Sequence, residues 1–240
     1  MESLEAELER ARDLDVGDLA DAIESIGFEC TRCGGCCKGE TDEPHTATVF
    51  PDEVRALQSA GASGAHGDDD APTEYDWRDV ARPMPYGLTE GEDGLEGETF
   101  EWALQTDACG DCRFYEEGSS TGDGSADDQQ GEGYCTVHED RPLICETYPF
   151  SVALGGTSQP MGEAVDEEGI VRAHECEGLG RDINRADAIT LAEALRTRAI
   201  RELEEAIAVR DEYEPTTVGS SEVVVHDSEG AKRPDGTSFD

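Results

Sequence analysis

A block of four cysteines within eight residues constrains this chain more than any other feature. The block reads Cys30-Thr-Arg-Cys33-Gly-Gly-Cys36-Cys37, and five more cysteines follow it: Cys109, Cys112, Cys135, Cys145 and Cys176. The sequence begins Met1-Glu-Ser-Leu-Glu, without the basic segment that opens a secretory signal, so we expect a cytoplasmic protein with reduced thiols. Clustered cysteines then indicate a metal or redox site rather than a disulfide framework.

The spacing within the block is typical of metal binding. Two intervening residues allow a tight turn to bring two sulfurs to one ion at about 2.3 Å, and glycines at 34 and 35 allow backbone amides to point at those sulfurs. The first three cysteines also match the C-x2-C-x2-C opening of ferredoxin-type loops, although Cys37 follows at once where those loops have a gap. Because neighbouring residues project their side chains apart, we expect Cys36 and Cys37 to face two sites or two parts of one cluster.

The remaining cysteines extend this pattern into a resemblance. The block, then Cys112-Arg-Phe114, then the stretch from Cys135 through Arg141-Pro142 to Cys145 and Tyr148-Pro149-Phe150, then Cys176, resembles the CxxCxxCC, or YkgJ-like, family. The similarity covers roughly residues 28–178. Members are described as zinc- or iron-chelating proteins and are often labelled iron-sulfur oxidoreductases, but the family indicates no catalytic residue. The resemblance implies eight metal ligands and leaves Cys109 as a supernumerary cysteine; the eight are Cys30, Cys33, Cys36, Cys37, Cys112, Cys135, Cys145 and Cys176.

Two interpretations of these ligands stay open. The first is an iron-sulfur protein, with a 4Fe-4S type cluster, that transfers electrons or acts as an oxidoreductase with an unidentified redox partner. The alternative is a non-enzymatic module in which Zn²⁺ ties the fold together and the surface binds a protein partner. We favour iron because adjacent Cys36 and Cys37 suit a multi-iron or paired site better than a single tetrahedron. Flagellin lysine methylases share a similar cluster, but no methyl-donor site is recognisable in this sequence.

Other polar side chains accompany the cysteines. His138 lies three residues after Cys135 and His174 two before Cys176, so each is a candidate zinc ligand, although hydrogen bonding beside the site or a surface position is the plainer interpretation. Arg141 either donates hydrogen bonds to sulfur or substrate, or forms salt bridges in an acidic protein.

Composition excludes several partners. Eighteen Lys and Arg stand against 58 Asp and Glu, which gives a net charge of −40 and disfavours nucleic acid and anionic membrane surfaces. Only two of those cations are lysines, and an acidic, lysine-poor surface suits a halophilic protein, because concentrated salt screens its self-repulsion. Leu, Ile, Val and Phe together supply only 41 of 240 residues, so the hydrophobic core alone is thin and a metal centre would support it.

Periodicity predicts an α+β fold with a small, irregular, metal-centred core, short strands, N-terminal helices and one long C-terminal helix. We expect two helices over 1–27, a cysteine-cluster domain over 28–180, a helix packed on it over 181–213, and a disordered acidic tail over 214–240. Within the domain, residues 61–97 form an acidic insertion and residues 117–133 a linker. Trp77, Val80, Met84 and Tyr86 hold the middle of that insertion to the body, and residues 99–105 alternate as one strand.

Overall fold

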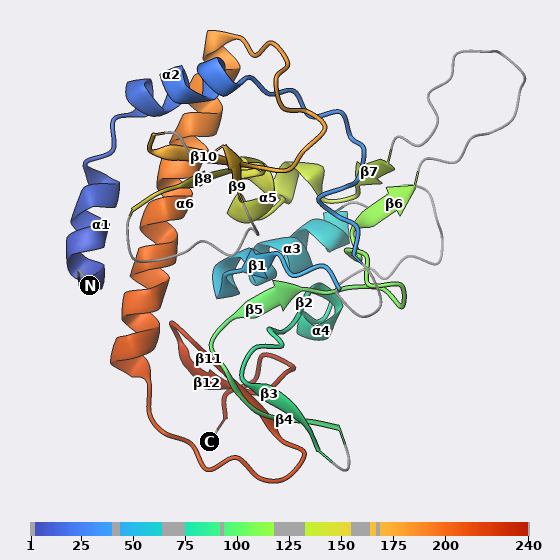
Figure 1. Ribbon diagram of the computed structural model, residues 1–240. Coiled ribbons are helices and arrows are strands. Elements are labelled where there is room, and N and C mark those ends of the chain that lie inside the picture. Colours follow the sequence, from blue (N-terminus) through green and yellow to red (C-terminus); the bar gives the residue numbers. More distant parts are fainter. Residues whose placement is uncertain are drawn as a thin grey trace, which may run out of the picture.

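Helices are interspersed with short, mostly antiparallel strands without regular βαβ units, so the fold is α+β, as predicted (Figure 1). The computed structural model describes residues 3–39, 44–63, 75–91, 94–117, 133–154, 164–166 and 169–239, and these ranges contain all nine cysteines. The helices are α1 (Leu4–Arg12), α2 (Val16–Ile26), α3 (Pro51–Ser63), α4 (Trp77–Val80), α5 (Leu143–Thr147) and α6 (Arg185–Glu212). A single 3-10 turn covers His138–Asp140.

The described strands form four small sheets. The described strands are β1 (Thr48–Val49), β2 (Ala81–Pro83), β3 (Leu88–Gly91), β4 (Gly94–Thr99), β5 (Trp102–Leu104), β6 (Tyr115–Glu117), β7 (Gly133–Cys135), β8 (Phe150–Val152), β9 (Ala164–Asp166), β10 (Val171–His174), β11 (Val223–Asp227) and β12 (Gly230–Lys232). They pair in the orders β1-β5-β2, β8-β10-β9, β12-β11-β4-β3 and β6-β7. Strand β8 pairs with β10 shortly before Cys176, with Val152 opposite Val171.

Local caps set the limits of α2. The Asp15 carboxylate accepts a hydrogen bond from the amide of Asp18 at 3.1 Å and so caps the start of α2. Gly27 ends the helix with a φ of 77°, a conformation that favours glycine. This exit delivers the chain directly to Phe28 and the first cysteine.

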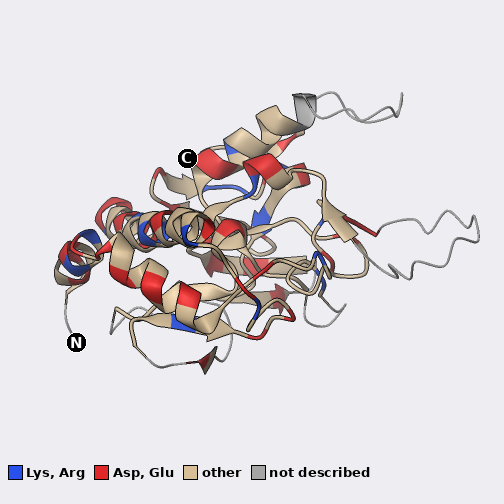
Figure 2. Ribbon diagram, turned by 90° about the horizontal axis from the view of Figure 1, so that it is seen from above, with Lys and Arg blue, Asp and Glu red and all other residues tan. Residues whose placement is uncertain are grey.

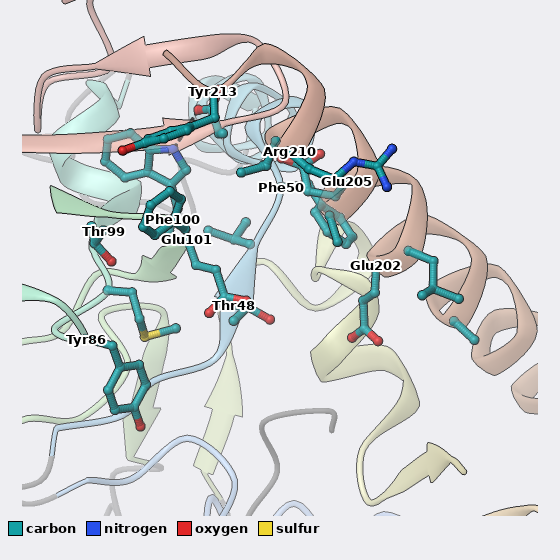
Figure 3. Close-up of a pocket in the computed structure, with 18 of the residues that line it drawn as sticks. Thr48, Phe50, Tyr86, Thr99, Phe100, Glu101, Glu202, Glu205, Arg210 and Tyr213 are labelled. Atoms are coloured by element: carbon teal, nitrogen blue, oxygen red, sulfur yellow. Dashed lines mark hydrogen bonds between the residues drawn. The ribbon is translucent and has the colours of Figure 1, made fainter. Parts of the chain in front are cut away.

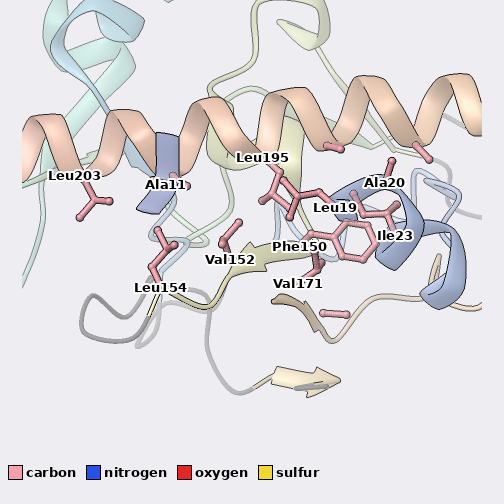
Figure 4. Packing of buried hydrophobic residues seen from close by; sticks show 14 of the residues in the cluster. Ala11, Leu19, Ala20, Ile23, Phe150, Val152, Leu154, Val171, Leu195 and Leu203 are labelled. Atoms are coloured by element: carbon pink, nitrogen blue, oxygen red, sulfur yellow. The ribbon is translucent and has the colours of Figure 1, made fainter. Parts of the chain in front are cut away.

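One hydrophobic core forms between the long helix α6 and the elements on either side of it. Leu195 of α6 is buried in one cluster with Leu19 of α2 and Phe150 of β8, and Figure 4 shows Leu195 beside the Phe150 ring. Leu203 joins the same cluster further along α6. Burying a leucine or phenylalanine side chain contributes about 1.5–3 kcal/mol. The core therefore joins the N-terminal helices and α6 to the strands that precede Cys176.

A second core lies beside the cysteines. Trp77 and Trp102 pack edge to face with ring centroids 5.1 Å apart, next to the buried Phe114. Cys112 is part of this core, and three other cysteines pack against it: Cys37, Cys135 and Cys145. Several thiols thus lie at the border of an apolar interior.

The structure corrects two predictions in the middle of the chain. The expected single strand over 99–105 is interrupted between Thr99 and Trp102, and Phe100 is 47% exposed although Trp102 is buried. The Phe100 ring turns instead toward Tyr213 and His226, with centroid distances of 5.6 and 5.3 Å, and local periodicity cannot reveal such distant partners. Tyr86 is 67% exposed and does not hold the insertion, whereas Trp77, Val80 and Met84 are buried as predicted.

The C-terminal region also differs from the predicted disordered tail. Strand β11 pairs in parallel with β4, with Val223 opposite Gly97 and Val225 opposite Thr99, and it pairs with β12 in antiparallel fashion. Val224 and Val225 are fully buried, so the one apolar triplet of this region has found a strand partner far away in sequence.

Some predictions fall outside the described residues. These are residues 64–74 and 92–93 of the acidic insertion and residues 118–132 of the linker, and the predicted domain limits remain predictions. Among the helices that the structure describes, none has both the length and the apolar character that a membrane span requires.

Candidate metal centre

Backbone hydrogen bonds bring the distant cysteines to the first block. At its start, the amide of Glu29 donates to the carbonyl of Gly178 at 3.0 Å, and the amide of Gly180 donates to Gly27 at 2.9 Å. At its end, the amide of Cys112 donates to the carbonyl of Cys37 at 2.7 Å. The block is therefore fixed at one end beside the segment of Cys176 and at the other beside Cys112.

The block itself is a tight turn. The amides of Cys37 and Lys38 donate to the Gly34 carbonyl at 2.8 and 3.0 Å, and the Gly35 amide lies 3.5 Å from the Cys33 sulfur. Gly34 has a φ of 76°, and a Cβ on it would lie 2.3 Å from the hydroxyl of Tyr115. Both the backbone conformation and the space thus require glycine at this position.

The remaining ligand candidates come from short elements around the turn. Cys135 ends β7 opposite Tyr115 of β6, and Cys145 lies in α5, where its amide donates to Pro142 at 2.9 Å. Glu53 of α3 accepts from the amide of Leu143 at 2.9 Å and so fixes the start of α5. The Cys176 sulfur accepts from the Gly178 amide at 3.4 Å.

The pKa values of the thiols show which cysteines lie within electrostatic reach of one another. Burial, with smaller contributions from the thiols of Cys135 and Cys36, raises the pKa of Cys112 to about 11. Burial also raises the pKa of Cys145 well above its usual range, with added contributions from Cys112, Cys36 and Cys135. We call Cys37, Cys112, Cys135 and Cys145 the inner set.

A second set lies on the more exposed side of the turn. Burial raises the pKa of Cys176, and the thiols of Cys33, Cys36 and Cys30 add to that shift. Burial, followed by Cys176, Cys36 and Cys33, also raises the pKa of Tyr148 to about 12. We call Cys30, Cys33 and Cys176 the outer set, and Cys36 is the one cysteine that interacts with both sets.

Cys36 and Cys37 are closer together than expected. Their sulfurs lie 3.8 Å apart, which differs from the prediction that the two side chains project well away from each other. A hydrogen bond from the Cys37 thiol is the main cause that lowers the pKa of Cys36 to about 7, and the same bond raises the pKa of Cys37. Two sulfurs bound to one tetrahedral ion at about 2.3 Å also stand about 3.8 Å apart, so adjacency alone does not exclude a single ion.

The eight thiols lie in one region of the fold, but their sulfurs do not meet around a single point. No group of three or more His, Cys, Asp or Glu side chains in the described ranges is close enough to hold one ion. No attraction brings protonated thiols closer together, whereas a metal cation replaces their protons and draws the sulfurs together. A donor set made of thiols alone suits zinc or iron-sulfur chemistry, so the residues fit the metals that the sequence predicts.

Comparison with known protein families agrees with this geometry. Residues 29–177 match the family model CxxCxxCC, described as "Putative zinc- or iron-chelating domain". The chain belongs to the CxxCxxCC family. The match covers more than half of the chain and includes all nine cysteines. Neither the curated proteins nor the solved structures yielded a match.

Cys109 differs from the other cysteines of the CxxCxxCC domain. It is exposed, and its amide donates to the Asp107 carboxylate at 2.8 Å in the turn before Cys112. Among the described residues, the Cys109 thiol does not contribute to the pKa shift of Cys112, Cys145 or Cys176. This placement agrees with a supernumerary cysteine, an assignment that stays a prediction.

The two candidate histidines of the CxxCxxCC domain occupy different surroundings. His174 is buried on β10, and its Nε2 lies 2.8 Å from the hydroxyl of Ser151. His138 is half-exposed and contacts Arg141. Neither imidazole is among the groups that shift a cysteine pKa, which supports the plainer interpretation of both.

Arg141 lies beside the sulfurs. Burial is the main influence on Cys135 and raises its pKa, and the guanidinium of Arg141 partly offsets that effect. Arg141 also helps to lower the pKa of Cys36, after the larger effect of the Cys37 hydrogen bond. In the part of the chain that the structure describes, no carboxylate pairs with Arg141, so a role beside the thiols fits better than surface ion pairing.

Sequence reasoning missed His45. Its ring Nε2 lies 2.9 Å from the carbonyl oxygen of Cys36, and Arg82 donates to the carbonyl oxygen of His45 at 2.8 Å. Burial lowers the pKa of His45, which favours the neutral ring with Nε2–H donated to Cys36. The imidazole therefore steadies the backbone of the cysteine that joins the two sets. No spacing rule could have predicted this role, because His45 lies nine residues after Cys36 and forms no recognisable motif with it.

Proposed function

We propose that the CxxCxxCC domain holds iron-sulfur chemistry of the 4Fe-4S type and serves electron transfer to a protein partner. The observation that carries the proposal is the arrangement of eight thiols in two sets that Cys36 joins. A cysteine that interacts with both sets suits a multinuclear or paired centre better than two isolated ions. The cluster would supply one-electron redox chemistry.

The ligands divide by burial. We assign Cys37, Cys112, Cys135 and Cys145 to an inner centre and Cys30, Cys33, Cys36 and Cys176 to an outer one. Cys112 is buried, whereas Cys30 and Cys36 are exposed, so the outer set lies nearer to solvent and to any redox partner. Arg141 and the Gly35 and Gly178 amides would stabilise negative charge on the sulfurs.

Structural zinc is the second candidate. The 3.8 Å separation of the Cys36 and Cys37 sulfurs, which matches that of two ligands on one tetrahedral ion, favours it. In that case the metal would hold together a fold with a thin core, and the domain would bind a partner without catalysis.

Anaerobic purification with elemental analysis and electron paramagnetic resonance distinguishes these functions. Iron-sulfur chemistry predicts a brown protein with a broad visible absorption, iron and acid-labile sulfide. A colourless sample with stoichiometric zinc and no iron would establish the zinc module instead.

Single substitutions test the ligand assignment. Cys145→Ser should remove the metal of the inner centre, and Cys176→Ser that of the outer centre. Cys109→Ser is the matched control and should leave metal content unchanged. Equal metal loss in Cys109→Ser and in either ligand variant would contradict the assignment.

We also infer a cytoplasmic location in a high-salt interior. Acidic residues are spread over the helices and strands that the structure describes (Figure 2). Both lysines are engaged in ion pairs: Lys38 with Glu117 at 2.8 Å, and Lys232 with Asp227 at 2.8 Å. The net charge of −40 argues against nucleic acid as a partner.

A further inference from the structure

A cavity of about 650 Å³ lies between the C-terminal half of α6 and strands β1 and β5, and no cysteine lines it (Figure 3). Ala199, Leu203 and Ala206 of α6 form one wall, and Met84 and Trp102 lie on the facing side. The two alanines leave room that larger side chains would fill. A volume and an apolar lining of this kind are typical of sites for small organic molecules.

Exposed aromatic rings gather at this cavity. Tyr86, Phe100 and Tyr213, which are 67%, 47% and 38% exposed, all line it. The rings of Phe100 and Tyr213 lie 5.6 Å apart. Large apolar side chains that remain exposed together mark a surface that another molecule covers.

Carboxylates give the cavity a negative charge. Glu101 enters from the loop before β5, and Glu202 and Glu205 enter from α6 (Figure 3). Burial, and then the charge of Glu202, raises the pKa of Glu101, which shows that the two carboxylates repel each other across the cavity. Burial also raises the pKa of Glu205.

The nearby cations are already engaged. Arg210, which lines the cavity, pairs with Glu5 at 2.7 Å and with Asp211 at 2.8 Å. Arg198, which lies in the core, pairs with Glu202 at 2.6 Å. Among the described residues, Glu101 has no cationic partner. A positive group placed between Glu101 and Glu202 would relieve their repulsion.

We propose that this cavity binds an organic cation with an apolar body, such as an arylalkylammonium ion. The body would lie against the alanines, Leu203 and Met84, and the ammonium would lie between Glu101 and Glu202. The aromatic rings would add cation–π attraction. An anion of the same shape would meet the carboxylates, because the lining cation Arg210 is already paired with Glu5 and Asp211. A neutral molecule would leave the repulsion in place.

Three matched probes test the proposal by isothermal titration calorimetry on the metal-loaded protein at one fixed salt concentration. They are 3-phenylpropylammonium, 3-phenylpropan-1-ol and 3-phenylpropanoate, which share one body and differ in head-group charge. We expect the ammonium ion to bind at least tenfold more tightly than the alcohol, and the carboxylate to show no binding. Equal affinity for the ammonium ion and the alcohol, or no binding of the ammonium ion, would overturn the proposal.

Variants locate the site. Glu101→Gln should remove most of the preference for the ammonium ion, because its side chain has no partner to lose among the described residues. Glu204→Gln is the matched control, since Glu204 lies on α6 outside the cavity lining and pairs with Arg12 at 2.9 Å, and it should keep wild-type affinity. An unchanged preference in Glu101→Gln would overturn the proposal.

A second variant fills the space. Ala206→Trp should abolish binding of the ammonium ion while far-ultraviolet circular dichroism shows the native helix content. A folded Ala206→Trp protein with wild-type affinity would place the ligand elsewhere. If this variant does not fold, the comparison of Glu101→Gln with Glu204→Gln still decides the proposal.

Discussion

At the scale of single residues, the cysteine turn depends on what Gly34 lacks. Its φ of 76° favours glycine, and its missing side chain makes room for the Tyr115 hydroxyl. Gly180 has the same φ of 76° but no atom within 4 Å of the Cβ position. Substitutions at the two glycines therefore distinguish the cost of the left-handed backbone conformation from the cost of a steric clash with Tyr115.

We predict that Gly34→Ala destabilises the protein by more than Gly180→Ala. Both variants lose about 1–2 kcal/mol to the left-handed conformation, and Gly34→Ala adds about 1–3 kcal/mol because Tyr115 must move. Denaturant unfolding of the metal-loaded variants gives the difference, and metal content should fall only in Gly34→Ala. Equal losses of stability with full metal content in both would show that Tyr115 does not restrict the turn.

At the scale of elements, a buried arginine ties α6 to the strands and helix around the cysteines. The Arg198 guanidinium donates to Glu202 at 2.6 Å, to the Thr147 hydroxyl at 3.0 Å and to the Phe150 carbonyl at 3.3 Å. Arg198 is fully buried, so its removal leaves these acceptors in an apolar interior.

We predict that Arg198→Met lowers the free energy of unfolding by about 3–5 kcal/mol, as expected when one partner of a buried ion pair is lost. Arg201→Met on the same helix is the control, because the Arg201 pair with Asp52 is exposed and should contribute below about 1 kcal/mol. Chemical denaturation of both variants measures the difference. Similar small losses would mean that α6 is held by its apolar face alone.

The β11–β12 hairpin should respond to acid. Arg55 is the main cause that lowers the pKa of Glu229 to about 2, and Lys232 adds to the effect. A carboxyl group with a lowered pKa stabilises the folded state above its unfolded pKa of about 4.5, and that contribution is lost as the pH falls from 4.5 toward 2. The stability of Glu229→Gln should therefore fall less steeply than wild type over this window, as thermal melts at several pH values would show. If the stability of the variant and that of the wild type fell in parallel over this window, the prediction would be wrong.

Local signals explain which elements could be predicted. Asp15 and Gly27 mark the ends of α2, and Arg141-Pro142 precedes α5, because caps and prolines act within a few residues. The break at Phe100 and the pairing of β11 with β4 depend on contacts across more than 100 residues, which no local pattern contains. For the same reason the family resemblance implied eight ligands, but only the fold indicates which thiols lie together and that His45 supports Cys36.

At the scale of the whole molecule, charge sets the conditions for stability. A net charge of −40 on 240 residues repels itself strongly in dilute buffer, and the Debye length falls to about 3 Å at 1 M salt. We predict that the melting temperature rises between 0.2 and 3 M KCl at constant pH. Differential scanning calorimetry measures it, and a melting temperature that is constant or falls over this range would refute the high-salt inference.

The hydrogen bonds between Gly27–Glu29 and Gly178–Gly180 hold the entry and exit of the matched domain next to each other. Opening this one contact would free both ends of the cysteine region in a single event. The amides of Glu29 and Gly180 should therefore exchange with deuterium at a common rate, and a chelator should accelerate both together. Loss of the metal and detachment of the terminal helices would then both follow from breaking the same pair of hydrogen bonds.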